Sequence, residues 1–110
     1  MYIQIQTTIA ANSVNDNVLA GNQFEFLNQN AVLEYGIVAA AAGLEVDVLI
    51  SERAITTRML PSTQNRVPIY DEDFTVRTGA LAGDRQIVRA RNTTGGNIVL
   101  FTSVRMTPVM

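Results

Sequence analysis

The segment GDRQIVRARNTTGGNIVLFTSVRM (residues 83–106) contains two runs in which apolar and polar side chains alternate. Successive side chains of a strand point to opposite faces, so both runs indicate half-buried β-strands. Between them, NTTGGN (residues 92–97) is rich in residues that accept a positive φ and form tight bends. We therefore predict an antiparallel hairpin in which strand 85–91 pairs with strand 98–106.

The alternation also predicts which side chains of this hairpin face the core. Those assigned to the core are Val88, Ala90, Leu100, Thr102 and Val104. Those assigned to the outside are Ile87, Arg89, Arg91, Val99, Phe101, Ser103 and Arg105. A slip of one residue would bury Arg89 and Arg91 without partners, which is strongly unfavourable. An exposed face that mixes arginine with bulky apolar side chains is typical of a protein–protein contact. The alternative is a strand buried on both faces, with the arginines extending past its edge.

The same periodicity recurs along the rest of the chain. Further strand-like runs lie at residues 3–9, 24–26, 33–37, 44–50, 55–60 and 74–76. Short strands spaced by about ten residues are typical of a sandwich or barrel. In AVLEYGIVAAAAG (residues 31–43) four consecutive alanines favour a helix, but Gly36 and the adjacent Ile37 and Val38 favour a strand. The predicted fold is all-β: a single-domain antiparallel β-sandwich over residues 1–110, jelly-roll-like, with seven or eight strands.

Charge is divided unequally between the two halves of the chain. Residues 1–52 contain six acids and no base, whereas residues 53–110 contain all eight arginines and four acids, and lysine is absent. Arginine tolerates burial at interfaces and pairs with carboxylates in a planar fork. This division favours contacts within or between subunits; the alternative is a compositional habit of the genome. The expected pairs join Arg53, Arg58, Arg77 or Arg89 to Glu34, Glu45, Asp47 or Glu52.

The sequence offers little for catalysis or metal binding. It has no histidine or cysteine, no Walker-type glycine loop and no GxSxG elbow, so we expect no catalytic residue, cofactor or metal. The acidic run at residues 71–73 could chelate calcium, but a solvated loop or a partner for a neighbouring arginine fits it better. Glu45 and Asp47 share one strand face, which leaves a glycosidase-like carboxylate pair as a minor alternative.

Binding to membranes or nucleic acids is not favoured either. No apolar run is long enough to span a bilayer, and the initial MYIQIQTTIA lacks the basic region of a secretory signal. The net charge of -2 and the few aromatic residues argue against a nucleic-acid groove. We therefore expect a protein made in the cytoplasm.

The composition favours an assembly. Charged residues make up 16% of the chain and hydrophobic residues 47%. A small sandwich exposes much of its surface and normally carries more charge than this to remain monomeric. We expect an obligate homo-oligomer, a trimer or larger.

The C-terminal run LAGDRQIVRARNTTGGNIVLFTSVRMTPV (residues 81–109), preceded by RVPIYDEDF (residues 66–74), resembles the closing strands of small β-sandwich virion proteins of bacterial viruses. The likeness covers roughly residues 65–109 and consists of the GDR strand entry, the ARNTT turn and the TP exit. In this family of capsid, cement and decoration proteins, outer loops and arms bind the shell or each other.

The resemblance implies a non-enzymatic structural protein of the virion that decorates or cements a capsid, with a major capsid protein as its partner. The alternative is a jelly-roll capsid protein, or a sugar- or receptor-binding module at a virion surface. The residues assigned to the candidate interface are Arg53, Arg58, Arg77, Arg89, Arg91, Phe101, Arg105, Glu45 and Asp47.

Overall fold

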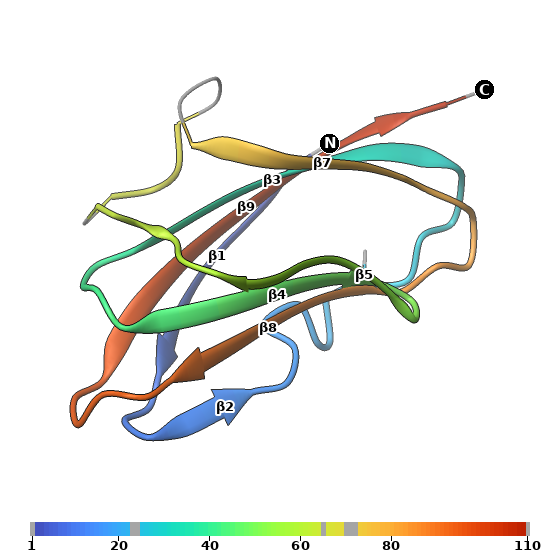
Figure 1. Cartoon of the computed structure of the whole chain (residues 1–110). Coiled ribbons are helices and arrows are strands. Elements are labelled where there is room, and N and C mark those ends of the chain that lie inside the picture. Colours follow the sequence, from blue (N-terminus) through green and yellow to red (C-terminus); the bar gives the residue numbers. More distant parts are fainter. Residues whose placement is uncertain (1, 23–24, 65, 70–72, 110) are drawn as a thin grey trace.

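The protein folds into two β-sheets packed face to face (Figure 1). The computed structural model describes residues 2–22, 25–64, 66–69 and 73–109, and these contain nine strands and no helix. The strands are β1 (Tyr2–Ile9), β2 (Ser13–Asn15), β3 (Ala31–Ala39), β4 (Leu44–Ile50), β5 (Arg53–Met59), β6 (Ser62–Thr63), β7 (Phe74–Ala80), β8 (Gln86–Asn92) and β9 (Ile98–Pro108). The predicted all-β sandwich is confirmed.

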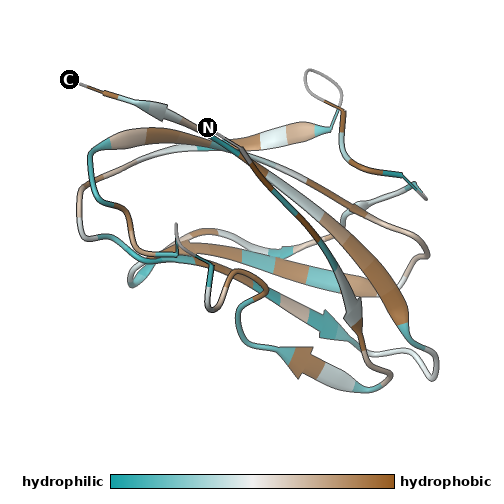
Figure 2. Ribbon diagram, turned by 180° about the vertical axis from the view of Figure 1, so that it is seen from behind, coloured by the Kyte–Doolittle hydropathy of each residue, from teal (hydrophilic) through white to brown (hydrophobic). Residues whose placement is uncertain are grey.

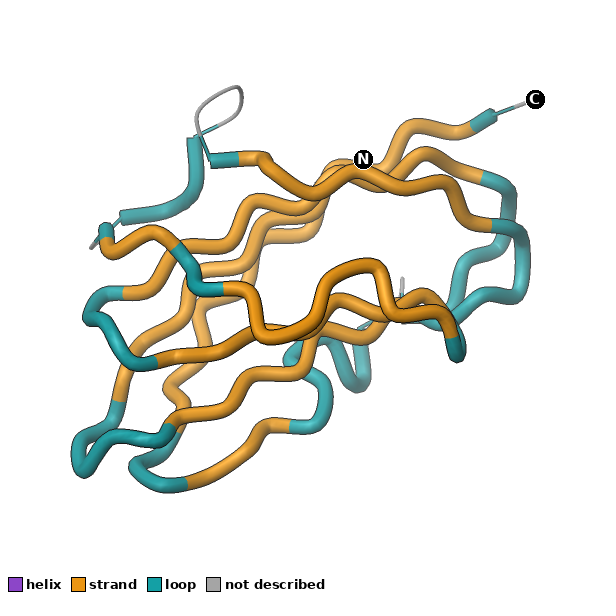
Figure 3. Tube along the Cα trace, viewed as in Figure 1, coloured by secondary structure: helices purple, strands orange, loops and turns teal. Residues whose placement is uncertain are grey.

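The strands pair in order from the two ends of the sequence toward its middle. The antiparallel pairs are β1 with β9, β2 with β8, β3 with β7 and β4 with β5. Together these pairs form one long double-stranded ribbon. The ribbon is wound so that β9 also pairs with β3, and β8 with β4. One sheet therefore has the order β1-β9-β3 with β7 and the short β6 beside β3, and the other has the order β2-β8-β4-β5. Figure 3 shows these two layers of strands and the loops that cross between them at both ends. The winding is that of a jelly roll.

The core lies between the sheets and follows the predicted alternation. Every second residue of β4 is buried, from Leu44 to Ile50, and the same holds for β9 from Ile98 to Met106. Apolar and polar positions alternate along the strands in Figure 2. Residues 31–39 form a strand, so the helical alternative for this segment is wrong; β-branched residues and cross-strand pairing outweigh the alanines. Of the predicted run at residues 24–26, Phe26 forms an isolated bridge with Arg85, and residue 24 lies outside the described residues.

The predicted hairpin between residues 85–91 and 98–106 is wrong. β8 and β9 lie in opposite sheets, and residues 93–97 cross from one sheet to the other. The buried side chain of Asn92 holds this crossing: its amide donates to the carbonyls of Ile9 (3.0 Å) and Gly96 (2.8 Å), and its oxygen accepts from Thr94. A tight glycine-rich bend can thus reverse the chain between layers as well as within one sheet.

Phe101 was expected on an exposed face, and this too is wrong. Phe101 and its cross-strand neighbour Val38 are buried on the outer face of the first sheet, apart from the main core. Residues 66–69 pass over this face, and Val67 and Pro68 line a small hollow with Phe101. A Cβ atom on Gly36 would lie 2.6 Å from the ring of Phe74 and 2.9 Å from Pro68, which is too close. Residues 66–69 can therefore pack this closely on the sheet only because residue 36 is glycine. For Phe101 and Ser103, β9 matches the alternative of a strand buried on both faces.

This second apolar cluster should contribute to stability. We expect Phe101→Ala to lower the free energy of unfolding by about 3 kcal/mol, because it leaves a void between β9, β3 and the covering segment. Leu81→Ala, at a side chain that is 63% exposed, is the control and should change it by less than about 0.5 kcal/mol. Urea denaturation of both variants measures the difference. Equal small effects would mean that the covering segment packs only loosely on Phe101.

Candidate interaction surface

Five of the predicted interface residues meet on the outer face of the β2-β8-β4-β5 sheet; we call them the charged face. They are Glu45 and Asp47 on β4, Arg58 on β5, and Arg89 and Arg91 on β8. The register places Glu45 opposite Arg91 and Asp47 opposite Arg89. Because both strands bury the intervening residues, their acids and arginines all point away from the core. Acid from the first half of the chain thus meets arginine from the second half.

Asp47 is the best-satisfied member of the charged face. Both of its oxygens accept hydrogen bonds from the guanidinium of Arg91, each at 2.9 Å, and the backbone N–H of Arg58 donates to Oδ1 at 2.7 Å. Burial alone would raise the pKa of Asp47, but these hydrogen bonds and the nearby charges of Arg91 and Arg89 hold it below its ordinary value. The carboxylate is therefore ionised and fixed in place at neutral pH.

Glu45 and Arg58 form a weaker pair at the rim of the charged face. The Nε of Arg58 donates to Glu45 at 3.0 Å, as expected from the sequence, but the arginine side chain is 75% exposed. Such exposed pairs contribute little to stability. Arg58 has a positive φ of 53°, and the register between β4 and β5 shifts nearby. The local bulge turns the Arg58 amide toward Asp47.

Arg89 is held differently from Arg91. It is half-buried opposite Asp47, and its Nε is buried without a hydrogen-bond partner among the described residues. A buried guanidinium nitrogen without a partner is costly. Of the charged face, Arg89 is thus the side chain with the most to gain from a further acceptor.

The remaining predicted residues lie elsewhere, so the predicted outer face that joined Arg89 and Arg91 to Phe101 and Arg105 does not exist. Arg77 and Arg105 are on the outer face of the other sheet, where the register places both beside Glu34. Arg53 lies at one end of the sandwich, where it donates to the carbonyl of Gly79 at 3.3 Å and approaches Asp84 at 3.9 Å. Phe101 is buried, as described above. The hairpin error is the cause, because it placed β8 and β9 on one face.

The end of the sandwich that contains Arg53 also carries an open apolar hollow of about 450 Å³, which we call the apolar end. Its lining residues are Asn30, Ala31, Val32, Arg53, Gly79, Ala80, Leu81, Asp84 and Val109. Leu81 is 63% exposed and Val109 50% exposed. In Figure 1 this is the end at which the C-terminus lies. The exposed Leu81 and Val109 beside Arg53 and Asp84 make this end a candidate contact site.

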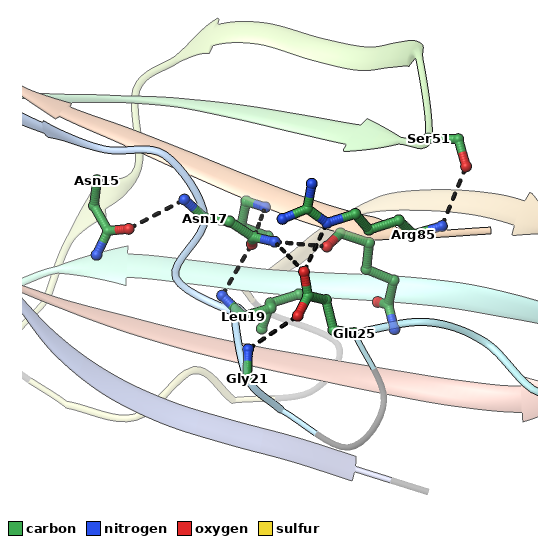
Figure 4. A network of polar contacts seen from close by, with 9 residues as sticks. Asn15, Asn17, Leu19, Gly21, Glu25, Ser51 and Arg85 are labelled. Atoms are coloured by element: carbon green, nitrogen blue, oxygen red, sulfur yellow. Dashed lines mark hydrogen bonds and ion pairs between the residues drawn. The ribbon is translucent and has the colours of Figure 1, made fainter. Parts of the chain in front are cut away.

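A buried polar network between the sheets was not predicted (Figure 4). The side chain of Asn17 accepts from the backbone N–H groups of Leu19 (3.0 Å) and Val88 (3.1 Å) and donates to the carbonyl of Gln86 (3.1 Å). The fully buried Gln86 in turn accepts from the hydroxyl of Tyr35 at 2.8 Å. The network ties the irregular chain after β2 to β8 and to the opposite sheet.

Glu25 completes this network at its outer end. It accepts from the Gly21 amide at 2.9 Å and from Nε of Arg85 at 2.6 Å. These contacts, the Gly21 bond foremost, lower the pKa of Glu25 despite its burial. The signal for the network was present in the sequence: Gln86 and Asn92 have the parity of Val88 and Ala90, which places amides on the core side of β8. The side-chain oxygens of Asn17, Glu25 and Gln86 all accept hydrogen bonds from the chain itself, which indicates a structural role for the network.

No family model, curated protein or solved structure matches the chain. Within the described residues no helix is long and apolar enough to cross a membrane, and no group of three or more acids could hold a metal ion. The acidic run at 71–73 lies outside the described residues except for Asp73, which accepts hydrogen bonds from Arg66 and from the Ile69 amide.

The Asp47 carboxylate should make the stability pH-dependent. A carboxylate whose pKa is lowered by folding stabilises the fold above its unfolded-state pKa, and this contribution is lost as the pH falls through the lower folded-state value. We expect Asp47→Asn to lower the free energy of unfolding by about 1–3 kcal/mol at neutral pH. The variant should then lose less stability than the wild type below about pH 4.

Urea titrations across this pH range measure both effects. Asp16→Asn, at an exposed acid, is the control because it changes the net charge equally without breaking a described ion pair. Parallel curves for the wild type and Asp47→Asn would contradict the role of Asp47.

Proposed function

We propose that this protein is a structural subunit of a virion that decorates or cements the capsid of a bacterial virus. It acts as a homo-oligomer, a trimer or larger, and its second partner is the major capsid protein. The work it does is mechanical: contacts between subunits and with the shell hold the capsid together. No step of chemistry is involved.

Two independent observations support this proposal. The run of residues 81–109 resembles the closing strands of small virion sandwich proteins, and the chain is wound as a jelly roll, an architecture that viral capsid domains share with lectins and cupins. A fold by itself does not define a function, because each common architecture hosts many functions. The exposed side chains are therefore the more specific support for this function.

The observation that carries the proposal is the contrast between the charged face and the apolar end. Four ion pairs with short distances among the described residues all lie within the chain. They join arginines to acids of the same subunit and are made by Arg58, Arg66, Arg85 and Arg91. These pairs occupy the acids within the subunit, which leaves the charges less available to a partner than the sequence suggested. The apolar end instead leaves Leu81 and Val109 exposed, with Arg53 and Asp84 at its rim. An apolar centre with a polar rim is the anatomy of a protein–protein contact.

The first consequence is that the purified protein should not be a monomer. We expect light scattering at micromolar concentration to give a mass well above the 12.0 kDa of one chain, because association would remove the exposed Leu81 and Val109 from water. A mass of one chain, combined with no affinity for shells, would contradict the assembly function.

The second consequence concerns the shell. Purified protein should co-sediment with empty shells assembled from the major capsid protein of the same genome. Leu81→Asp should weaken this binding by about tenfold or more, because it places a charge in the centre of the apolar end. Leu60→Asp is the matched control: its side chain is 75% exposed at the other end of the sandwich, and it adds the same charge. Binding that is insensitive to Leu81→Asp would place the contact elsewhere.

A further inference from the structure

The edges of the two sheets differ in how well they are protected against pairing with another chain. Exposed edges are normally blunted by charge, proline, bulges or short length. β2 has three residues and β6 two, β5 carries two arginines and register shifts, and β7 carries Arg77. β1 has none of these devices: its eight residues, YIQIQTTI, contain no charge and no proline, and its register with β9 is unbroken. Within the described part of the chain, β1 pairs with β9 alone.

The hydrogen-bond pattern identifies which groups of β1 face outward. The amide of Ala40 donates to Val99 and the amide of Val109 to Asn30, so the odd-numbered residues of β9 bond toward β3. Along a strand the backbone N–H and C=O groups of successive residues point to opposite edges. The even-numbered residues of β9 therefore form their backbone hydrogen bonds with β1. Their partners on β1 are the odd-numbered Ile3, Ile5, Thr7 and Ile9. The N–H and C=O groups of the even-numbered residues of β1 consequently point away from β9, at the open edge of the sheet.

These outward groups belong to Gln4, Gln6 and Thr8, whose side chains are exposed on the outer face of the sheet, and to Tyr2. Unpaired main-chain groups in a row are a template for another strand. The uncharged glutamines do not repel a second copy of the same strand. The edge is therefore complementary to itself.

We propose that β1 pairs antiparallel with β1 of a second copy, across a two-fold axis that passes through Ile5. In this register Gln4 lies opposite Gln6 of the second copy and Tyr2 opposite Thr8, so every outward N–H and C=O of the even-numbered residues finds a partner. Ile5 lies against its own equivalent in a close, non-hydrogen-bonded pair, on the side of the core. Ile5 and Thr7 are only half-buried in the single chain, and the second copy would cover them.

The pairing joins two five-stranded sheets into one continuous sheet, and it is isologous, as a two-fold contact must be. A closed assembly larger than a dimer needs a second contact, for which the apolar end is available. The inference does not require the virion function, because it concerns the association of the purified chain with itself.

The test uses charges placed on the two glutamines. In the proposed register Gln4→Lys/Gln6→Lys sets like charges opposite each other at two positions, and it should weaken self-association at least about tenfold. Gln4→Lys/Gln6→Glu sets opposite charges at the same positions and should retain association or strengthen it. Thr57→Lys/Gln64→Lys adds the same charge as the double-lysine variant at exposed polar residues outside both β1 and the apolar end, and should behave like the wild type. Sedimentation equilibrium from low micromolar to submillimolar concentration measures each association constant.

A backbone variant separates hydrogen bonding from charge. Gln6→Pro removes one outward N–H that the single chain does not use, and proline is tolerated at such an edge position. It should weaken association while circular dichroism and the melting temperature stay close to those of the wild type. If that variant loses the fold, the lysine variants, at exposed side chains, still decide the question.

Three results would overturn the proposal: a wild type that is monomeric throughout the series, a double-lysine variant that associates like the wild type, or equal loss in the lysine–lysine and lysine–glutamate variants. The last would exclude the two-fold through Ile5, because registers centred on Gln4 or Gln6 place identical charges together. Shell binding that survives in the double-lysine variant would leave the virion function standing without the β1 contact.

Discussion

The structure depends on one constraint: the middle of β9, from Leu100 to Val104, is buried on both faces, so the polar groups of its backbone must be paired within the protein on both edges. On one face it meets the main core, and on the other it lies beneath residues 66–69. A buried backbone group without a partner is costly, and in this chain β1 and β3 supply the partners. β8 is likewise flanked on both sides, by β2 and β4. Two central strands that follow each other in the chain thus belong to different sheets, and the rest of the winding follows from this division.

The alternation of apolar and polar side chains made the strands and their core faces predictable. Side-chain direction in a strand reverses at each residue, so it can be read from neighbouring positions in the sequence. The core assignments of Val88, Ala90, Leu100, Thr102 and Val104 are all confirmed. Pairing between strands is not local: the bend at residues 92–97 is compatible with a hairpin and with a crossing between sheets. In the folded chain the side chain of Asn92 stabilises the crossing through a hydrogen bond to the carbonyl of Ile9, far away in the sequence. Periodicity contains no information about such a contact.

The same distinction applies to the candidate surfaces. The unequal distribution of charge correctly indicated that acids of the first half meet arginines of the second, as Asp47 and Arg91 do. Which of these residues share a face depends on sheet order, so Arg105 was grouped with Arg89 and Arg91 although it lies on the other sheet. Arg77 lies opposite Glu34, one of the acids expected as its partner. The apolar end could not be predicted, because Leu81 and Val109 are brought together only by the folded chain. The burial of Glu25 beside Arg85 likewise depends on a turn that has no regular period.

The pairing of the first strand with the last has a kinetic consequence. Ile9 lies opposite Ile98, and Tyr2 opposite Arg105, so β1 finds its partner only after residues 98–105 have left the ribosome. Loops of this length are slow to close, and folds dominated by such distant pairings take milliseconds to seconds to form. During synthesis β1 is an uncharged, strand-forming segment whose two edges are both open. Before the native sheet exists, this segment is open to premature pairing on both edges, which is the kind of exposure that chaperones counter.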